Sequence, residues 1–224
     1  MAAAYVQKAI NGSAAASTTI AVSTGSDVTA GNGIAVFFRD STPGASLSCA
    51  DGLGNTYTQI HIASSAANGS LAVFVAKDIN GGACTVTGTS SATTRKCIGV
   101  REFSGLDLTA PEDQFADAIG TDDTVEGPAI TMTRGGALMS AVNTAQTITF
   151  DTDYTEGQQN STGRAGDCHQ ITVAVTEGAD HTLSSAADWE TITWDLIEPA
   201  AGGAGGNVGR LLFADERNYK AMID

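Results

Sequence analysis

A glycine-rich turn leads directly into an unbroken apolar run at Gly31-Asn32-Gly33-Ile34-Ala35-Val36-Phe37-Phe38-Arg39. In an extended chain Ile34, Val36 and Phe38 point to one side, while Ala35 and Phe37 point to the other. Apolar residues on both faces are typical of a strand in the middle of a sheet that is covered on both sides. We therefore expect residues 34–39 to form a central strand.

Similar short runs recur along the chain, with Gly, Asn and Asp between them. The expected strands are residues 18–23, 34–39, 56–62, 71–76, 85–89, 97–103, 129–133, 137–142, 147–150, 169–176 and 190–197. Residues 104–128 have no clear period and are expected to be a long connection. No amphipathic helix of about ten residues occurs before residue 199, which argues against α/β folds because their parallel strands need crossover helices. We predict an all-β fold, an antiparallel β-sandwich of the jelly-roll or immunoglobulin-like kind.

The two ends of the chain differ from its middle. We expect residues 1–17 to be an N-terminal arm, residues 18–198 the sandwich domain, and residues 199–209 a flexible Gly/Ala linker. Residues 210–224 are expected to be a C-terminal docking segment, because apolar residues return there among charged ones at roughly helical spacing. The candidate partner-docking residues are Leu211, Leu212, Phe213, Tyr219, Met222 and Ile223.

Small residues and acidic charge dominate the composition. Ala, Gly, Ser and Thr make up nearly half of the 224 residues, and 25 acidic against 11 basic side chains give a net charge of −14. The four Lys and seven Arg form no cluster in the sequence, so we expect no nucleic acid as a partner. No run approaches the roughly 20 apolar residues of a membrane span, and residues 1–19 lack the continuous apolar region of a signal peptide. We expect a protein made in the cytoplasm that does not bind membranes.

Cysteine and histidine are spaced too widely for metal or redox motifs. The four cysteines, Cys49, Cys84, Cys97 and Cys168, include no C-x-x-C pair and are expected to be small buried or half-buried thiols. Disulfide pairing in any of three patterns stays open. The histidines, His61, His169 and His181, lack the H-x-H and H-E-x-x-H spacings of zinc ligands. We expect no metal and no cofactor.

Nucleophilic and phosphate-binding motifs are also missing. The sequence has no G-x-S-x-G elbow, and the neighbours Cys168 and His169 would point to opposite faces of a strand. The glycine-rich residues 202–209 place Val208 where a G-x-G-x-x-G loop needs its third glycine. Glu102 and Glu190 are the two carboxylates that we would name for a glycosidase, because each shares a strand face with apolar residues. Charges at strand ends explain both more simply, so we predict no enzymatic activity.

Three weaker signals point to binding rather than to catalysis. The acidic turns Asp122-Asp123 and Asp151-Thr152-Asp153 offer oxygen ligands for calcium, but neither has the 12-residue EF-hand loop. Asn11, Asn68 and Asn160 begin N-x-S/T triplets, which mean little without a secretion signal. Trp189 and Trp194 are five residues apart and would face opposite sides of a strand, one in the core and one exposed or at an interface. An exposed tryptophan would suit sugar binding.

Three segments together resemble a known sequence pattern. The segments are Gly31-Asn32-Gly33-Ile34-Ala35-Val36-Phe37-Phe38, then Asp51-Gly52-Leu53-Gly54-Asn55-Thr56-Tyr57-Thr58, then Val100-Arg101-Glu102-Phe103-Ser104-Gly105-Leu106-Asp107 with Pro111, Asp113 and Gln114. They are similar to β-sandwich proteins of bacteriophage virions and of some bacterial surfaces, over about residues 18–198. The pattern consists of turns and strands, and the resemblance brings no catalytic residues with it.

The resemblance implies a structural role in a virion. Proteins of this kind are capsid decoration (cement) proteins on the outside of the head, commonly trimers, or parts of tails and fibres. We expect a decoration protein whose partner is the major capsid protein or another virion protein, because an acidic protein suits the face away from packaged DNA. The alternative is a tail or fibre-associated module that binds a receptor or glycan.

Overall fold

The computed structural model describes residues 2–160, 162 and 164–200. Within these residues the protein is all-β and has no helix, so none is long and apolar enough to cross a membrane. The strands of the first half are β1 (Ala4–Ser23), β2 (Gly33–Asp40), β3 (Leu47–Asp51), β4 (Thr58–Ser65), β5 (Gly69–Ala76) and β6 (Thr85–Ser104). Those of the second half are β7 (Phe115–Gly120), β8 (Thr124–Glu126), β9 (Ile130–Thr131), β10 (Gly136–Thr144), β11 (Ile148–Thr149), β12 (Thr155–Asn160), β13 (Ala165–Thr172), β14 (Thr176–Glu177), β15 (Asp180–Leu183) and β16 (Trp189–Ile197).

Each half of the chain forms one large antiparallel sheet. The first has the order β1-β6-β2-β5-β4, with β3 paired to a further part of β6, and the second has the order β12-β13-β10-β16-β7. Short sheets made by β11-β15-β8 and by β14-β9 accompany the second. Every residue of β2, β5, β10 and β16 is buried, as expected for central strands covered on both faces.

The two large sheets share one topology. We leave out β3 and number the five remaining strands of each large sheet in chain order. The first strand then lies beside the fifth, the fifth beside the second, the second beside the fourth, and the fourth beside the third. This order describes β1-β6-β2-β5-β4 and, read from its other edge, β12-β13-β10-β16-β7. The segment expected to be one sandwich domain therefore contains the same sheet plan twice, although no repeat is visible in the sequence.

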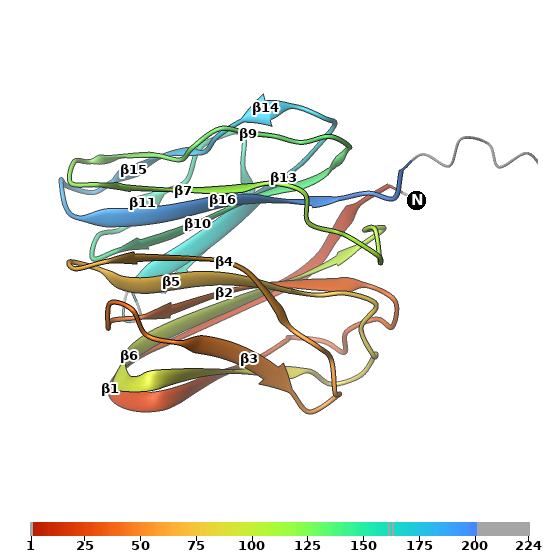
Figure 1. Ribbon diagram of the computed structural model, residues 1–224, viewed down its shortest axis with the longest axis horizontal. Helices are drawn as coiled ribbons and strands as arrows, with labels where there is room; N and C mark the ends of the chain where they lie inside the picture. Colours follow the sequence, from red (N-terminus) through yellow and green to blue (C-terminus); the bar gives the residue numbers. More distant parts are fainter. Residues whose placement is uncertain (1, 161, 163, 201–224) are drawn as a thin grey trace, which may run out of the picture.

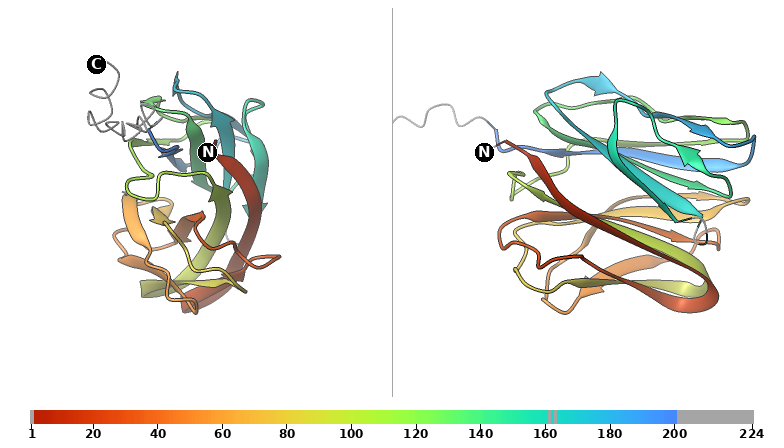
Figure 2. Two further views of the ribbon diagram at one scale, coloured as in Figure 1. Left: turned by 90° about the vertical axis from the view of Figure 1, so that its right-hand side faces the viewer. Right: turned by 180° about the vertical axis from the view of Figure 1, so that it is seen from behind.

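The sheets are stacked face to face around three apolar layers (Figures 1 and 2). The middle layer lies between the two large sheets and includes Phe37, Leu71 and Phe103 from the first and Met139 and Trp194 from the second. The outer face of the first sheet packs against a layer closed by β3 and by the far ends of β1 and β6. The outer face of the second sheet is covered by the small sheets.

The long strands β1 and β6 bend together and so belong to two layers. Their pairing shifts between Ser13 and Ser17 and again before Thr19, where β-bulges interrupt the register. Residues before these shifts pair within the first large sheet, and residues after them lie in the outer layer beside β3 (Figure 2). Residues 4–17, expected as an arm outside the sandwich, are therefore part of β1.

Some expected segments differ from the structure or lie outside it. The connection expected at residues 104–128 contains β7 and β8, and the polar residues 155–160 form β12. The two strands expected at 85–89 and 97–103 are both parts of β6. Of the expected linker at 199–209 only residues 199 and 200 are described, and the docking segment 210–224 lies outside the described residues. The latter contains all six docking candidates, Leu211, Leu212, Phe213, Tyr219, Met222 and Ile223.

Candidate functional site

Three arginines line one pocket where the two halves of the protein meet. The pocket has a volume of about 440 Å³ and contains Arg39 at the end of β2, Arg95 in the bend of β6, and Arg164 in the turn between β12 and β13. These are three of the five arginines that the structure describes. In a chain with a net charge of −14, this gathering of positive charge marks the pocket as the candidate site.

Arg39 forms the floor of the pocket and is held by neutral groups. Its Nε donates to Asn143 Oδ1 at 3.0 Å, Nη1 to Ser41 Oγ at 2.6 Å, and Nη2 to the carbonyl of Asn68 at 3.0 Å. The residue is 5% exposed and forms no ion pair with any carboxylate in the described chain. Burial lowers the pKa of its guanidinium, and the charge of Arg164 acts in the same direction, against the weaker opposing effects of Asp40 and Glu190. A buried cation without an ion-pair partner is costly, so a bound anion would stabilise it.

Arg95 and Arg164 present free guanidiniums to the same pocket. Within the part of the chain that the structure describes, neither side chain forms a hydrogen bond or an ion pair. The backbone of Arg164 has φ +61°, in the left-handed region that side chains rarely adopt, and its amide donates to the carbonyl of Asn160 at 2.8 Å. Strained backbone of this kind persists where surrounding contacts fix it, often at binding sites.

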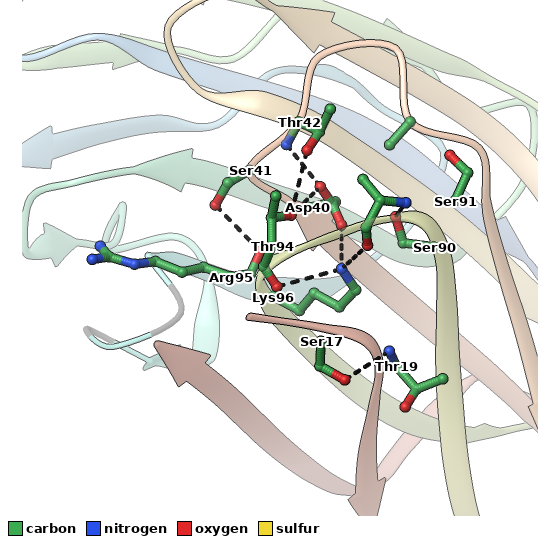
Figure 3. A network of polar contacts seen from close by, with 12 residues as sticks. Ser17, Thr19, Asp40, Ser41, Thr42, Ser90, Ser91, Thr94, Arg95 and Lys96 are labelled. Atoms are coloured by element: carbon green, nitrogen blue, oxygen red, sulfur yellow. Dashed lines mark hydrogen bonds and ion pairs between the residues drawn. The ribbon is translucent and has the colours of Figure 1, made fainter. Parts of the chain in front are cut away.

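A buried ionic network supports the wall that carries Arg95 (Figure 3). Lys96 pairs with Asp40 and donates to the carbonyl of Ala92 at 2.9 Å, and Asp40 also accepts from Thr94 Oγ1 at 2.6 Å and from the amide of Thr42 at 2.7 Å. Burial acts to raise the pKa of Asp40, but the hydrogen bonds from Lys96 and its neighbours outweigh it and leave that pKa low. The network fixes the bend of β6 beneath the pocket.

The backbone of Arg95 is tied to the end of β2. Ser41 donates to the carbonyl of Arg95 from its amide at 3.1 Å and from its hydroxyl at 3.2 Å. The side chain of Arg95 points away from the network of Asp40 and Lys96 (Figure 3). The pocket therefore has fixed walls, and Arg95 extends from one of them.

A second buried polar cluster joins the two large sheets, and its charged groups pair with one another. Arg101 pairs with Asp167 at 2.5 Å, donates to the carbonyl of Glu156 at 2.7 Å, and lies 3.0 Å from Nδ1 of His169. Tyr5 stacks on His169 with ring centroids 4.9 Å apart. Burial lowers the pKa of His169 to about 4, and the charge of Arg101 adds to this, so the ring is neutral and accepts from Arg101. These residues cross-link the sheets.

The two glutamates considered for a glycosidase are separated by a sheet. Glu102 lies on the outer face of the first large sheet, where it accepts from the amide of Thr29 at 2.8 Å and from Asn32 Nδ2 at 2.6 Å. Glu190 lies between the large sheets and accepts from Asn143 Nδ2 at 3.2 Å. Both are buried, so the structure does not bring them together as a catalytic pair.

The remaining histidines and the cysteines are structural. His181 accepts from the amide of Asp151 at Nδ1 and lies 2.9 Å from Ser140 Oγ at Nε2, and burial lowers its pKa to about 4. His61 pairs with Asp117 at 2.7 Å and stacks on Phe115, joining β4 to β7. All four cysteines are free, and three are buried, as the sequence predicts. Burial raises the pKa of the Cys97 thiol to about 12, so it is unreactive.

Both tryptophans are buried, which corrects the expectation that one of them is exposed or at an interface. They do face opposite sides of β16: Trp194 lies between the large sheets, and Trp189 lies under the small sheets and donates to Asp122 Oδ1 at 2.9 Å. Small sheets cover the outer face of β16, and therefore neither ring offers a platform for sugar binding.

In the acidic turns Asp151 accepts from backbone amides and Asp122 from a side chain. Asp151 accepts from the amides of Asp153 at 3.0 Å and Asp180 at 3.2 Å, while Asp122 accepts from Trp189. In the described chain no three His, Cys, Asp or Glu side chains are placed to hold a metal ion. The sequence gives no sign of the arginine pocket, because its three arginines come from separate segments and meet only in the fold.

Comparisons with known proteins leave the site to be interpreted from its own chemistry. No family model matches the chain, and no match is found among curated proteins or among solved structures.

Proposed function

We propose that the protein is a non-enzymatic structural component of a bacteriophage virion, a decoration protein that binds the outside of the head as a homotrimer. Its partner in this proposal is the major capsid protein. The sequence resemblance described above supports it, and so does the acidic net charge, which suits a surface away from packaged DNA. We place the fold nearest to the jelly-roll and immunoglobulin-like sandwiches, because its sheets are antiparallel and their strand order is not sequential.

The observation that carries the proposal is the position of the two ends of the described chain. The amide of Ala3 donates to Glu198 Oε1 at 2.9 Å, although the two residues are 195 positions apart. The start of β1 and the end of β16 therefore lie at the same end of the stacked sheets (Figure 2). Segments that leave a rigid body from one end can attach it to a shell while the rest projects outward.

The polar core is consistent with a scaffold. In the described residues the buried carboxylates and imidazoles considered for catalysis accept hydrogen bonds from backbone or neighbouring side chains. Those contacts stabilise turns and join sheets. A protein that is assembled onto a particle needs this kind of stability.

Immunogold electron microscopy of purified virions tests the proposal. We expect antibodies against the protein to label the outside of the heads, and we expect light scattering to give the mass of a trimer for the purified protein. Virions that lack the protein, or that carry it inside the shell, would overturn the proposal. Deletion of residues 199–224 is expected to leave a folded protein that no longer joins the particle, and unchanged incorporation would contradict this part.

A tail or fibre-associated binding module is the second candidate, and the arginine pocket favours it. A pocket lined by charged and hydroxyl groups suits recognition of a polar ligand on a host surface. Labelling of tails instead of heads in the same micrographs would select this candidate.

A further inference from the structure

We propose that the pocket lined by Arg39, Arg95 and Arg164 binds an acidic sugar through its carboxylate or sulfate group. The proposal concerns a ligand site, and it holds for either location of the protein on a particle. Three features of the pocket carry it: its uncompensated charge, its unused hydrogen-bond donors and the composition of its walls.

The arginines of the pocket have no ion-pair partner in the described protein. Arg39, Arg95 and Arg164 form no ion pair there, and the charge of Arg164 acts on Arg39 as a like charge. The carboxyl groups that act on Arg39 are those of Asp40, which pairs with Lys96, and Glu190, which accepts from Asn143. Three like charges at one site repel one another, and an oxyanion bound between them would turn that repulsion into attraction.

The unused donors match an oxyanion. A guanidinium has five N–H groups, so Arg39 keeps two after its three hydrogen bonds. The side chains of Arg95 and Arg164 donate to none of the described residues. The planar fork of arginine fits carboxylate and sulfate groups by paired hydrogen bonds. Arg39 is fixed by Ser41, Asn68 and Asn143, and therefore part of the site is preorganised and loses little entropy on binding.

The remaining walls suit the rest of a sugar. The same pocket is also lined by Ser41, Thr93 and Thr94 and by Ala14, Ala16 and Ala67. The hydroxyls of Ser41 and Thr94 already donate to the carbonyl of Arg95 and to Asp40, so toward a ligand they act as acceptors. A hydroxyl oxygen with a free lone pair can accept from a sugar hydroxyl, and small apolar groups pack against the C–H face of a pyranose ring. The volume of about 440 Å³ is within the range of small-molecule sites.

Calorimetric titration of the full chain with glucuronate tests the proposal, with glucose as the neutral counterpart of nearly the same shape. We expect glucuronate to bind and glucose to show no binding at the same concentrations. Arg95→Gln and Arg164→Gln are each expected to weaken glucuronate binding about 10-fold or more, because each removes charged hydrogen bonds. Neither side chain forms a hydrogen bond or an ion pair with the described residues, so the thermal stability of these variants should equal that of the unaltered protein.

Arg134→Gln is the matched control for charge. Arg134 pairs with Asp107 at 2.8 Å and does not line the pocket, so its replacement removes one positive charge elsewhere. We expect this variant to bind glucuronate as the unaltered protein does. Absence of glucuronate binding at millimolar concentration, equal binding of glucose, or equal weakening by Arg134→Gln and Arg95→Gln would each overturn the proposal.

Discussion

The guanidinium of Arg39 donates from Nε to Oδ1 of Asn143 at 3.0 Å and so joins the second strand of one large sheet to the second strand of the other. The contacts at the edges of the two sheets are also symmetric. At one edge β1 of the first sheet contacts β12 of the second, and at the other edge β4 contacts β7. The first strand of each sheet thus lies over the third strand of the other. The two halves pack like the subunits of a two-fold dimer within one chain, and Arg39 and Asn143 lie near its centre.

Asn143→Ala should destabilise the protein by about 3 kcal/mol. The change removes the acceptor of Arg39 Nε and leaves a buried guanidinium with an unsatisfied donor, and it also removes the donor to Glu190. Urea unfolding of the variant measures the loss. Asn11→Ala is the matched control, because Asn11 is exposed and its hydrogen bond to the carbonyl of Ala21 is worth about 1 kcal/mol or less. Equal effects of the two substitutions would contradict the central role of Asn143.

Glu190→Gln should raise stability at alkaline pH. Burial raises the pKa of the Glu190 carboxyl from its usual 4.5 to about 7, and its Oε1 has no hydrogen-bond partner in the described chain. Because the folded state prefers the neutral acid, the favourable contribution of Glu190 is complete below about pH 4.5 and is lost as the pH rises through about 7. Complete ionisation of Glu190 lowers the free energy of unfolding by about 3 kcal/mol.

Urea unfolding at pH 5 and at pH 8.5 distinguishes this effect from a general change in stability. The glutamine variant should be more stable than the unaltered protein at pH 8.5, and the advantage should shrink toward pH 5. An advantage of equal size at both pH values would show that ionisation of Glu190 is not its cause.

The central strands are the part of the fold that the sequence predicts best. The run from Ile34 to Phe38 has apolar residues on both faces because β2 is covered by an apolar layer on each side. Its pattern therefore predicts a central strand. Edge strands lack such a signal. Residues 155–160, Thr-Glu-Gly-Gln-Gln-Asn, form β12 because their backbone pairs with β13, and backbone pairing leaves no trace in the side chains.

Long-range placement is the part that the sequence does not determine. The odd separation of Trp189 and Trp194 correctly predicts that they face opposite sides of their strand. Their burial depends on tertiary packing, because the first large sheet covers Trp194 and the small sheets cover Trp189. The pocket is a stronger example, because Arg39, Arg95 and Arg164 are isolated in sequence. The docking candidates at 211–223 stay a prediction, since they lie outside the described residues.

Acid should unfold the protein through its neutral buried histidines. Burial lowers the pKa of His181 from 6.5 to about 4, and the amide of Asp151 donates to Nδ1, so a proton there would face another donor. The contribution of His181 to stability is complete above about pH 6.5 and is lost as the pH falls through about 4. Protonation of His181 lowers the free energy of unfolding by about 3 kcal/mol.

His181→Gln isolates this effect. The glutamine costs stability at pH 8 because it loses ring packing against Phe150 and Tyr154, but it carries no titrating group. Its stability should therefore fall less steeply than that of the unaltered protein between pH 6.5 and pH 4, as measured by urea midpoints. Parallel pH curves for the two proteins would rule out His181 as a source of the acid sensitivity.

Gly99 should tolerate no side chain, because the ring of Phe37 lies on it. The two residues are opposite each other on β6 and β2, and a Cβ added at Gly99 would lie 2.1 Å from Phe37 Cε1. Gly99→Ala is expected to cost about 3 kcal/mol, because the buried ring has to leave its preferred rotamer. Gly52→Ala is the control, since no atom lies within 4 Å of a Cβ there, and its effect should stay within about 0.5 kcal/mol.

Phe37→Leu makes room beside Gly99, so the double variant should lose less stability than the sum of the single changes. Strictly additive losses would show that the contact between Phe37 and Gly99 does not set the spacing of β2 and β6.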